Sequence, residues 1–240
     1  MNKKVVVITG ASSGLGKEIA KLYIQKNYEL VVSGRNKSGL EEFKKENVDI
    51  ITGDLTNKKT IKKIADLVIK KHKKIDILIN NAGILYIQPF EKNTKVQLDS
   101  IFEINVKSHM FMTQKVFPLM KKQQFGHIVN IISTAGKEGK LNHTLYCATK
   151  YAMSGFTESL RLEAKKYKIK VTGIYPGGMR TKIFSKIPHK IDKSTFMEAK
   201  SVAKAIVDIT ELDDISPDSL VLTRLALSSP SLYDLIPGSK

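Results

Sequence analysis

The stretch that decides the fold is VVVITGASSGLG, which occupies residues 5–16. Four consecutive apolar, β-branched residues predict a strand that is buried on both faces, as in parallel sheets. Three glycines in the spacing G-x-x-x-G-x-G follow at once, and an amphipathic segment from about Leu15 predicts a helix. Glycine lets the backbone approach a ligand closely, and the N-terminus of a helix attracts phosphate. The stretch therefore predicts a phosphate-binding turn between a first strand and a first helix.

The rest of the chain alternates short apolar runs with longer amphipathic segments. Such a pattern predicts an α/β fold, a single-domain doubly wound (Rossmann-like) parallel sheet of about seven strands with helices on both faces. We expect one domain over residues 1–240, because no linker or repeat interrupts the pattern. The expected strands are 5–8, 29–33, 48–51, 76–79, 127–132, 170–174 and 220–222, and the expected helices are 15–25, 40–45, 58–71, 94–123 with a break near Asn105, 145–166 and 202–209.

The composition is that of a globular protein with a basic surface. Of 240 residues, 42% are hydrophobic and 26% are charged, and 40 Lys+Arg against 23 Asp+Glu give a formal net charge of +17. Arginine is scarce, and lysine is spread over every expected helix instead of being gathered on one element. This pattern favours a solvated lysine-rich surface over a polyanion site, and we expect no nucleic acid as a partner.

Cysteine usage and hydropathy indicate the compartment. The single cysteine, Cys147, excludes a disulfide within the chain and fits a reducing environment. No apolar run reaches the length of about 18 residues that a membrane span needs, so we expect no membrane association and a cytoplasmic protein. The five histidines lack the spacing and the carboxylate company of metal ligands, and we expect no metal.

The predicted phosphate-binding turn of a doubly wound fold indicates a dinucleotide cofactor. The residues at the end of the second expected strand bear on whether that cofactor is NAD(H) or NADP(H). NAD enzymes of doubly wound folds commonly place a carboxylate there to bind the ribose hydroxyls. This chain has Ser33-Gly34-Arg35-Asn36 instead. No carboxylate repels a 2′-phosphate at this point, and the Arg35 guanidinium can bind one with two hydrogen bonds. The sequence favours NADP(H) over NAD(H), with a solvated surface arginine as the alternative.

Three side chains suggest proton transfer. Tyr146 and Lys150 stand four residues apart on an expected helix and therefore share a face. Ser133 follows the fifth expected strand, at the edge where doubly wound folds bind ligands. A phenol is a poor base at neutral pH, and we expect the nearby ammonium together with a positive oxidised nicotinamide to lower its pKa toward the working range. The Ser133 hydroxyl can donate a hydrogen bond to a developing alkoxide.

These motifs together resemble the short-chain dehydrogenase/reductase family. The resemblance rests on Thr9-Gly10-x-x-x-Gly14-x-Gly16, Asn80-Asn81-Ala82-Gly83, Ser133, Tyr146-x-x-x-Lys150 and Pro176-Gly177, in the family's order and spacing, and it covers residues 5 to about 181. It implies a catalytic set of Asn105, Ser133, Tyr146 and Lys150, in which Tyr146 is the general acid/base and Asn105 holds a water that relays protons to Lys150. It also implies a bond from Lys150 to the nicotinamide ribose.

The resemblance completes the expected cofactor site. It places Asp54 at the adenine amine, Asn81 near the adenosine ribose and Thr181 beside the nicotinamide carboxamide. The expected cofactor-binding residues are Thr9, Gly10, Ser12, Ser13, Gly14, Leu15, Gly16, Arg35, Asp54, Leu55, Asn81, Ala82, Gly83, Tyr146, Lys150, Pro176, Gly177 and Thr181. The alternatives are structural: a helix cap for Asp54, strand caps for Asn81 and Gly83, a helix break at Asn105 and a plain turn at Pro176-Gly177.

Other regions are expected to shape the substrate pocket and the assembly. Residues 179–200 resemble the family's lid over the active site, and Asn142 and His143 are candidates for the pocket wall. The helices near 100–123 and 147–166 resemble a subunit interface, which implies a homodimer or a homotetramer, although both helices can serve the sheet alone.

The sequence thus predicts an NADP(H)-dependent oxidoreductase that acts on a small-molecule carbonyl or secondary alcohol. The alternatives are a 3-oxoacyl-carrier-protein reductase and a non-catalytic NADP-binding redox sensor. The segment after Gly83, Ile84-Leu85-Tyr86-Ile87-Gln88, lacks the arginine-containing pattern usual in those reductases. A sensor has no need of the proton donor that Tyr146 supplies.

Overall fold

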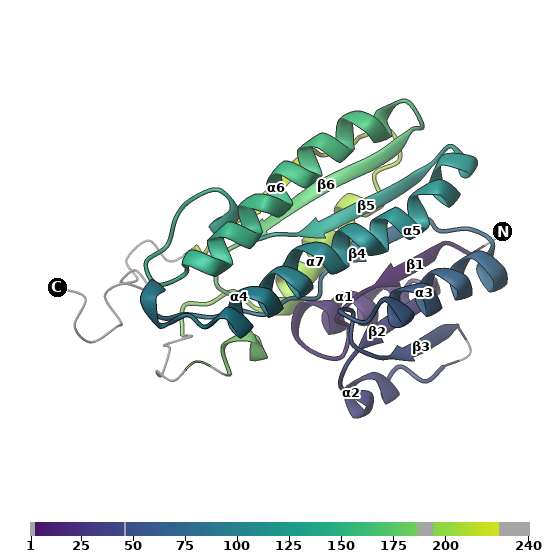
Figure 1. Cartoon of the computed structure of the whole chain (residues 1–240). Helices are drawn as coiled ribbons and strands as arrows, with labels where there is room; N and C mark the ends of the chain where they lie inside the picture. The colour runs from purple at the N-terminus through teal and green to yellow at the C-terminus, as the bar shows by residue number, and fades with distance from the viewer. Residues whose placement is uncertain (1–2, 46, 186, 188–193, 226–240) are drawn as a thin grey trace.

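A parallel sheet of seven strands forms the centre of the molecule. The computed structural model describes residues 3–45, 47–185, 187 and 194–225. Within them the strands run in the order β3-β2-β1-β4-β5-β6-β7, every neighbouring pair parallel (Figure 1). Their bounds are β1 Val5–Ile8, β2 Glu29–Gly34, β3 Val48–Thr52, β4 Ile77–Asn80, β5 Gly126–Ile131, β6 Ile169–Pro176 and β7 Ser219–Leu222.

Helices cover both faces of the sheet. One face carries α1 (Gly14–Gln25), α2 (Lys37–Glu41) and α7 (Ala199–Thr210), and the other carries α3 (Lys58–Leu67), α5 (Ser108–Gln123) and α6 (Thr144–Lys165) (Figure 1). The helix α4 (Lys95–Phe102) leads into α5 through a π-helical turn at Glu103–Lys107. A second π-helical turn, Val68–His72, extends α3. This arrangement confirms the predicted doubly wound α/β fold.

Alternate residues of each strand feed two separate cores. Val6 and Ile8 point toward α1 and α7, whereas Val7 points toward α3, α5 and α6. Side chains on a strand point to opposite faces in turn, so a strand buried on both sides has to be apolar at every position. The run Val5–Ile8 meets this requirement, with all four residues at most 2% exposed.

The predicted elements agree with the structure except at particular ends. The helix expected at 40–45 is wrong in its bounds: α2 spans Lys37–Glu41, because the Asn36 side chain caps it by accepting a hydrogen bond from the Gly39 amide. Asp76 lies outside β4, since its carboxylate accepts a 2.7 Å hydrogen bond from the Val5 amide at the start of β1. The expected break near Asn105 is confirmed and consists of the π-helical turn.

A buried chain of polar side chains holds the ends of β4 and β5 in place. The Asn80 amide nitrogen donates to Asn130 Oδ1 at 2.9 Å and to Thr113 Oγ1 at 3.0 Å. The Asn130 amide nitrogen donates to Thr157 Oγ1 at 2.9 Å. These bonds connect the two strands to α5 and α6 immediately below the carboxyl edge of the sheet. Buried polar groups that are paired in this way fix one arrangement of their elements.

The expected lid, residues 179–200, is described only in part. Residues 186 and 188–193 lie outside the described residues. On either side of them, Met179 pairs with Met197 in an isolated β-bridge and Lys182–Phe184 form a 3₁₀ turn. No helix in the described part of the chain has both the length and the apolar composition to cross a membrane.

Candidate active site

A cleft of about 820 Å³ opens at the carboxyl edge of the sheet. It lies beside β1, where the strand order reverses. The sheet continues from β1 through β2 to β3 on one side, and through β4 to β7 on the other. Open α/β sheets bind ligands at this kind of switch point. The sequence-predicted residues that line the cleft are Gly10, Ser12, Ser13, Gly14, Leu15, Arg35, Asp54, Leu55, Asn81, Ala82, Gly83, Ser133, Tyr146, Lys150, Pro176, Gly177 and Thr181. Thr9, Gly16 and Asn105 lie behind this wall.

The turn between β1 and α1 has the geometry of an anion site. Gly10 and Gly14 have positive φ angles of 67° and 57°, a region that favours glycine. A Cβ atom on Gly16 would stand 2.6 Å from the Gly10 carbonyl oxygen, so only glycine fits there. Ser13 precedes α1 in an extended conformation, and its side chain does not cap the helix. The backbone N–H groups in the first turn of α1 are therefore available to donate hydrogen bonds to a ligand bound in the cleft.

Asn81 and Thr9 fasten this turn to β4. The Asn81 side chain donates to the carbonyl oxygens of Thr9 at 2.8 Å and Gly10 at 3.2 Å, and its backbone amide donates to Thr9 Oγ1 at 2.9 Å. Both amide hydrogens of Asn81 are therefore used inside the protein. Asn81 thus has a structural role, of the kind kept as its alternative from the sequence, in which its side chain braces the glycine turn.

Arg35 and Asp54 lie together at the end of the cleft formed by β2 and β3. Their closest charged atoms are 4.0 Å apart, and both side chains are substantially exposed. The Asp54 carboxylate also accepts a 2.9 Å hydrogen bond from the Thr56 amide. Ser12 packs against Gly34 on the same wall, where a Cβ atom on Gly34 would meet Ser12 Oγ at 2.9 Å. The exposed Arg35 guanidinium thus lines the same part of the cleft as the turn between β1 and α1, which carries the hydroxyl groups of Ser12 and Ser13.

Ser133 and Tyr146 meet above the end of β5. Ser133 has a φ of 151°, which is unusual for a residue with a side chain and stores strain where the chain leaves the strand. Burial raises the pKa of Tyr146 to about 12, and the neighbouring Ser133 hydroxyl opposes this by lowering it. The His143 ring lies 6.4 Å from the Tyr146 ring, centroid to centroid.

Lys150 approaches Tyr146 from one turn further along α6. Its ammonium donates a 3.0 Å hydrogen bond to the Ile131 carbonyl and lies 5.5 Å from the centroid of the Tyr146 ring. The side chain is buried, and burial lowers the pKa of Lys150 to about 7. The group is therefore able to gain or lose a proton near neutral pH.

In the protein without a nicotinamide, the pKa of Tyr146 lies above its ordinary value. The lowering expected from Lys150 and an oxidised nicotinamide together stays a prediction, and Lys150 alone is not among the groups that shift this pKa. The physical reason for the raised pKa is burial. A phenol that is removed from water resists ionisation, and burial is the largest influence on the Tyr146 pKa.

Asn105 is fully buried in the π-helical turn and connects two walls of the site. Its side-chain oxygen accepts from the Ile84 amide at 2.8 Å, and its nitrogen donates to the Ile84 carbonyl at 2.9 Å and to Thr149 Oγ1 at 3.2 Å. Asn105 thus holds the segment after β4 against Thr149 of α6, the residue that immediately precedes Lys150. Its side chain serves this connection, and a role with water stays a prediction.

The substrate side of the cleft contains residues that the sequence analysis did not select. His143 lines the cleft, as hypothesised, whereas Asn142 does not. The other lining residues there include Met179, Lys182, Ile183 and Phe184 of the expected lid, and outside it Ile84, Leu85, Tyr86, Ser100, Ile104, Glu138, Lys140, Thr223 and Arg224. The apolar run Ile84–Ile87 was visible in the sequence, but nothing local indicated that Thr223 and Arg224 return to the cleft from β7.

The shape of the cleft suits a dinucleotide. Its glycine turn and uncapped helix end fit a diphosphate, Arg35 and Asp54 stand at one end, and Tyr146 and Lys150 stand at the other. Its volume is within the range of small-molecule sites. No group of three or more metal-ligating side chains occurs among the described residues.

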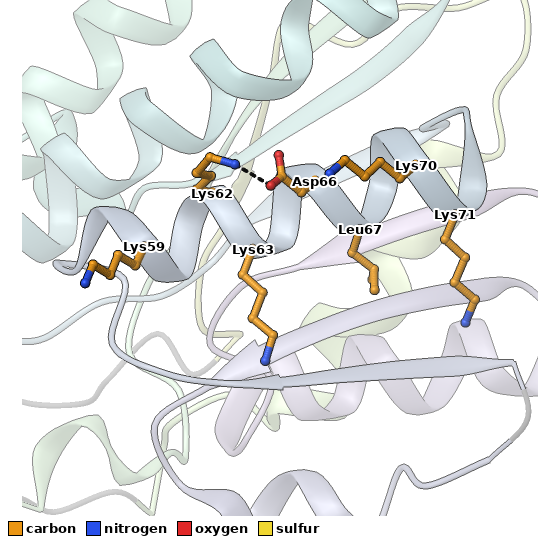
Figure 2. Close-up of a pocket in the computed structure, with 7 residues that line it drawn as sticks. All are labelled: Lys59, Lys62, Lys63, Asp66, Leu67, Lys70 and Lys71. Carbon is orange, nitrogen blue, oxygen red and sulfur yellow. Dashed lines mark hydrogen bonds and ion pairs between the residues drawn. The ribbon is translucent and has the colours of Figure 1, made fainter.

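A second hollow of about 450 Å³ lies on the outer surface of α3 and its π-helical turn. Figure 2 shows its lysines extending from the helix in different directions, with Lys62 paired to Asp66. Its lining consists of Lys59, Lys62, Lys63, Asp66, Leu67, Lys70 and Lys71. Those residues are five lysines, one aspartate and one leucine on a single helical surface, with no glycine turn or aromatic ring among them, so we place the chemistry in the cleft at the sheet edge.

Comparison with known proteins gives consistent matches. The family model for short chain dehydrogenases matches residues 4–192. An uncharacterized oxidoreductase of Staphylococcus aureus is 31% identical over 86% of this chain and 90% of its own length. Two solved structures are also similar: a 3-ketoacyl-(acyl-carrier-protein) reductase from Brucella melitensis complexed with NADH (26% identity, TM-score 0.85, 92% and 96% of the two chains) and serine dehydrogenase from Escherichia coli (28%, 0.81, 91% and 96%).

The burial of Lys150 predicts a pH-dependent stability. Its pKa falls from 10.5 to about 7 on folding, so the unfolded chain binds more protons between these values and the free energy of unfolding rises with pH in this window. The limit for one group is ~1.4 kcal/mol per pH unit. We expect urea unfolding from pH 7 to 9.5 to give a steeper rise for the parent than for Lys150→Met. Parallel curves for the two proteins would contradict this account.

Proposed function

This chain belongs to the short-chain dehydrogenase family, and from that premise we propose that it transfers a hydride between NADP(H) and a carbonyl or secondary alcohol carbon. The family makes it an NAD(P)-dependent dehydrogenase/reductase. The observation that carries the finer proposal is the meeting of Ser133, Tyr146 and Lys150 on one wall of the cleft. These three residues, supported by Asn105, are our proposed catalytic set.

The proposed mechanism assigns a proton role to each side chain. When bound, the nicotinamide supplies or accepts the hydride. In the reducing direction Tyr146 Oη gives a proton to the substrate oxygen, and the Ser133 hydroxyl donates a hydrogen bond to that oxygen. The protonated Lys150 stabilises the tyrosinate that remains. With a pKa of about 7, Lys150 also exchanges protons readily at neutral pH. Asn105 fixes the wall behind Lys150, and by family resemblance we propose that it also holds a relay water.

We propose that NADP(H) is preferred over NAD(H). Arg35 is exposed at the end of β2, where it meets the 2′ position of a ribose in this type of site, and its partner Asp54 is 4.0 Å away. A guanidinium binds a phosphate with two parallel hydrogen bonds. The similar Brucella structure contains NADH, so structural similarity does not by itself predict NADP(H). The proposed preference for NADP(H) therefore rests on Arg35.

The substrate is proposed only by class, a small carbonyl compound or its alcohol. The Brucella relative is named as a 3-ketoacyl-(acyl-carrier-protein) reductase, which keeps that activity as the second candidate. We also propose that the chain is one catalytic domain and that the described part of the expected lid, where Met179, Lys182 and Phe184 line the cleft, covers the substrate. A redox sensor has no use for a phenol and a hydroxyl placed together beside a buried lysine.

We propose further that two copies pair through α5 and α6. The outer surface of these helices exposes Phe111, Tyr151 and Leu162, the last with 75% of its area accessible. Tyr151 and Leu162 are eleven residues apart on α6, about three turns, so they share a face. Exposed apolar residues gathered on neighbouring helices are typical of interfaces.

Replacing the phenol tests the mechanism. We expect Tyr146→Phe to lower kcat by ~10²-fold to 10⁴-fold or more, because the proton donor is lost. The dissociation constant for NADPH, measured by fluorescence, should stay close to the parent value. Tyr167→Phe, just beyond the end of α6 and outside the cleft lining, is the matched control and should keep full activity. An active Tyr146→Phe variant would refute the assignment.

Replacing the guanidinium tests the cofactor preference. The parent should bind NADPH more tightly than NADH, and Arg35→Asp should weaken NADPH binding by ~10-fold to 100-fold while leaving NADH binding much less affected. Arg161→Gln is the control, because Arg161 pairs with Asp218 away from the cleft. Equal affinities of the parent for the two cofactors would overturn the proposal.

A charge on the exposed face of α6 tests the assembly. We expect the parent to sediment as a dimer or tetramer, and Leu162→Glu to shift the population toward monomer with little change in the circular dichroism spectrum. Ile215→Glu, which alters an exposed apolar residue outside both helices, should leave the assembly intact. A parent that is monomeric at micromolar concentration would contradict the proposed interface.

A further inference from the structure

Arg224 differs from the other three arginines of the chain in its electrostatic surroundings. Arg35, Arg161 and Arg180 each have a carboxylate oxygen within 4.0 Å, from Asp54, Asp218 and Glu198 respectively. Among the described residues Arg224 has no such partner, although it is only partly exposed and lines the cleft. An arginine directed to a ligand cleft without an internal counter-charge is suited to an anion that comes from outside.

The position of Arg224 is set by aromatic and hydrogen-bonded contacts. One guanidinium nitrogen, Nη1, donates to Thr195 Oγ1 at 3.0 Å. The guanidinium carbon lies 5.5 Å from the centroid of the Phe196 ring, and that ring packs against Phe184 at 5.4 Å. A cation is attracted to the face of an aromatic ring, so Phe196 holds the group while the rest of its donor fork stays available.

The register of the sheet places Arg224 on the substrate side. Leu222, the last residue of β7, pairs with Pro176 at the end of β6, and the Gly177 amide donates to the Leu222 carbonyl at 2.8 Å. Arg224 follows two residues beyond, past the strand ends. It is therefore close to the Pro176-Gly177 turn and on the opposite side of the switch point from Arg35, which serves the adenine end.

The charges in this half of the cleft are positive. Glu138 is the one carboxylate that lines it among the described residues, and Lys140 already pairs with it at 2.8 Å. Lys182 lines the same region and forms no ion pair with the described residues. The remaining wall is largely apolar, with Leu85, Ile183 and Phe184. The combination fits a molecule with an apolar body and one negative group.

We propose that Arg224 binds the carboxylate of the substrate, so that the enzyme reduces keto acids or oxidises the corresponding hydroxy acids. The inference rests on the proposed function and adds the substrate class to it. A planar guanidinium matches a planar carboxylate with two hydrogen bonds. In the reduction the ketone carbon receives the hydride, its oxygen receives the proton from Tyr146, and the carboxylate is unchanged. Arg224 is a specificity-determining residue that acts away from the reacting carbon.

The test compares keto acids with their neutral esters. The probes are 2-oxo-2-phenylacetate and 4-oxo-4-phenylbutanoate, which place the carboxylate directly on the ketone or two methylene groups away, and the methyl ester of each. We expect Arg224→Gln to raise KM for the preferred acid by ~10-fold to 100-fold with little change in kcat and little effect on the ester. Arg224→Lys keeps the charge but loses the fork, and should lie between. Arg161→Gln is the control.

A binding measurement separates this inference from the proposed chemistry. Calorimetric titration of both acids into the NADPH complex of Tyr146→Phe requires no turnover, and at least one should bind in an Arg224-dependent manner. Such binding without turnover by the parent would uphold the carboxylate site while refuting the proposed reaction. The inference is overturned if neither acid binds, or if acid and ester weaken equally in Arg224→Gln. A weaker NADPH affinity in that variant would instead assign Arg224 to the cofactor diphosphate.

Discussion

Parallel hydrogen bonding among all seven strands is the constraint on which the site depends. It requires every strand to run in one direction, so the loops that follow β1, β2, β4, β5 and β6 emerge at one edge. The Asn80–Asn130 pair and its threonine partners fix the final residues of two of these strands against the helices. Residues as distant in the chain as Thr9 and Asn81 thereby meet within hydrogen-bond distance.

Burial gives the two titrating groups their complementary properties. Tyr146 is held protonated and Lys150 is held close to half-protonated at neutral pH, and both effects come from the loss of water. A positively charged nicotinamide ring beside them would favour the tyrosinate form, as any nearby cation does. The strained Ser133 backbone lies beside this pair, and the Ser133 hydroxyl opposes the effect of burial on the Tyr146 pKa.

Local signals made much of this predictable from the sequence. The run Val5–Ile8, the glycine turn and the four-residue spacing of Tyr146 and Lys150 depend on neighbours in the chain, and the structure places them as expected. Contacts between distant segments could not be predicted from any local pattern. Examples are those of Asn81 with Thr9 and of Arg224 with Thr195 and Phe196. The raised pKa of Tyr146 in the protein without a nicotinamide has the same origin, because burial is a property of the whole fold.

The π-helical turn at Glu103–Lys107 sets the angular phase between α4 and α5. One additional residue in a helical turn rotates everything after it by about 100° about the axis. The rotation lets Asn105 face the cleft wall while Met112 and Val116 face the sheet. The packing of α5 consequently restricts the chain length between residues 103 and 107. Deleting one residue here would rotate the core face of α5 by about 100° away from the sheet, whereas the same deletion in a surface loop would only shorten the loop.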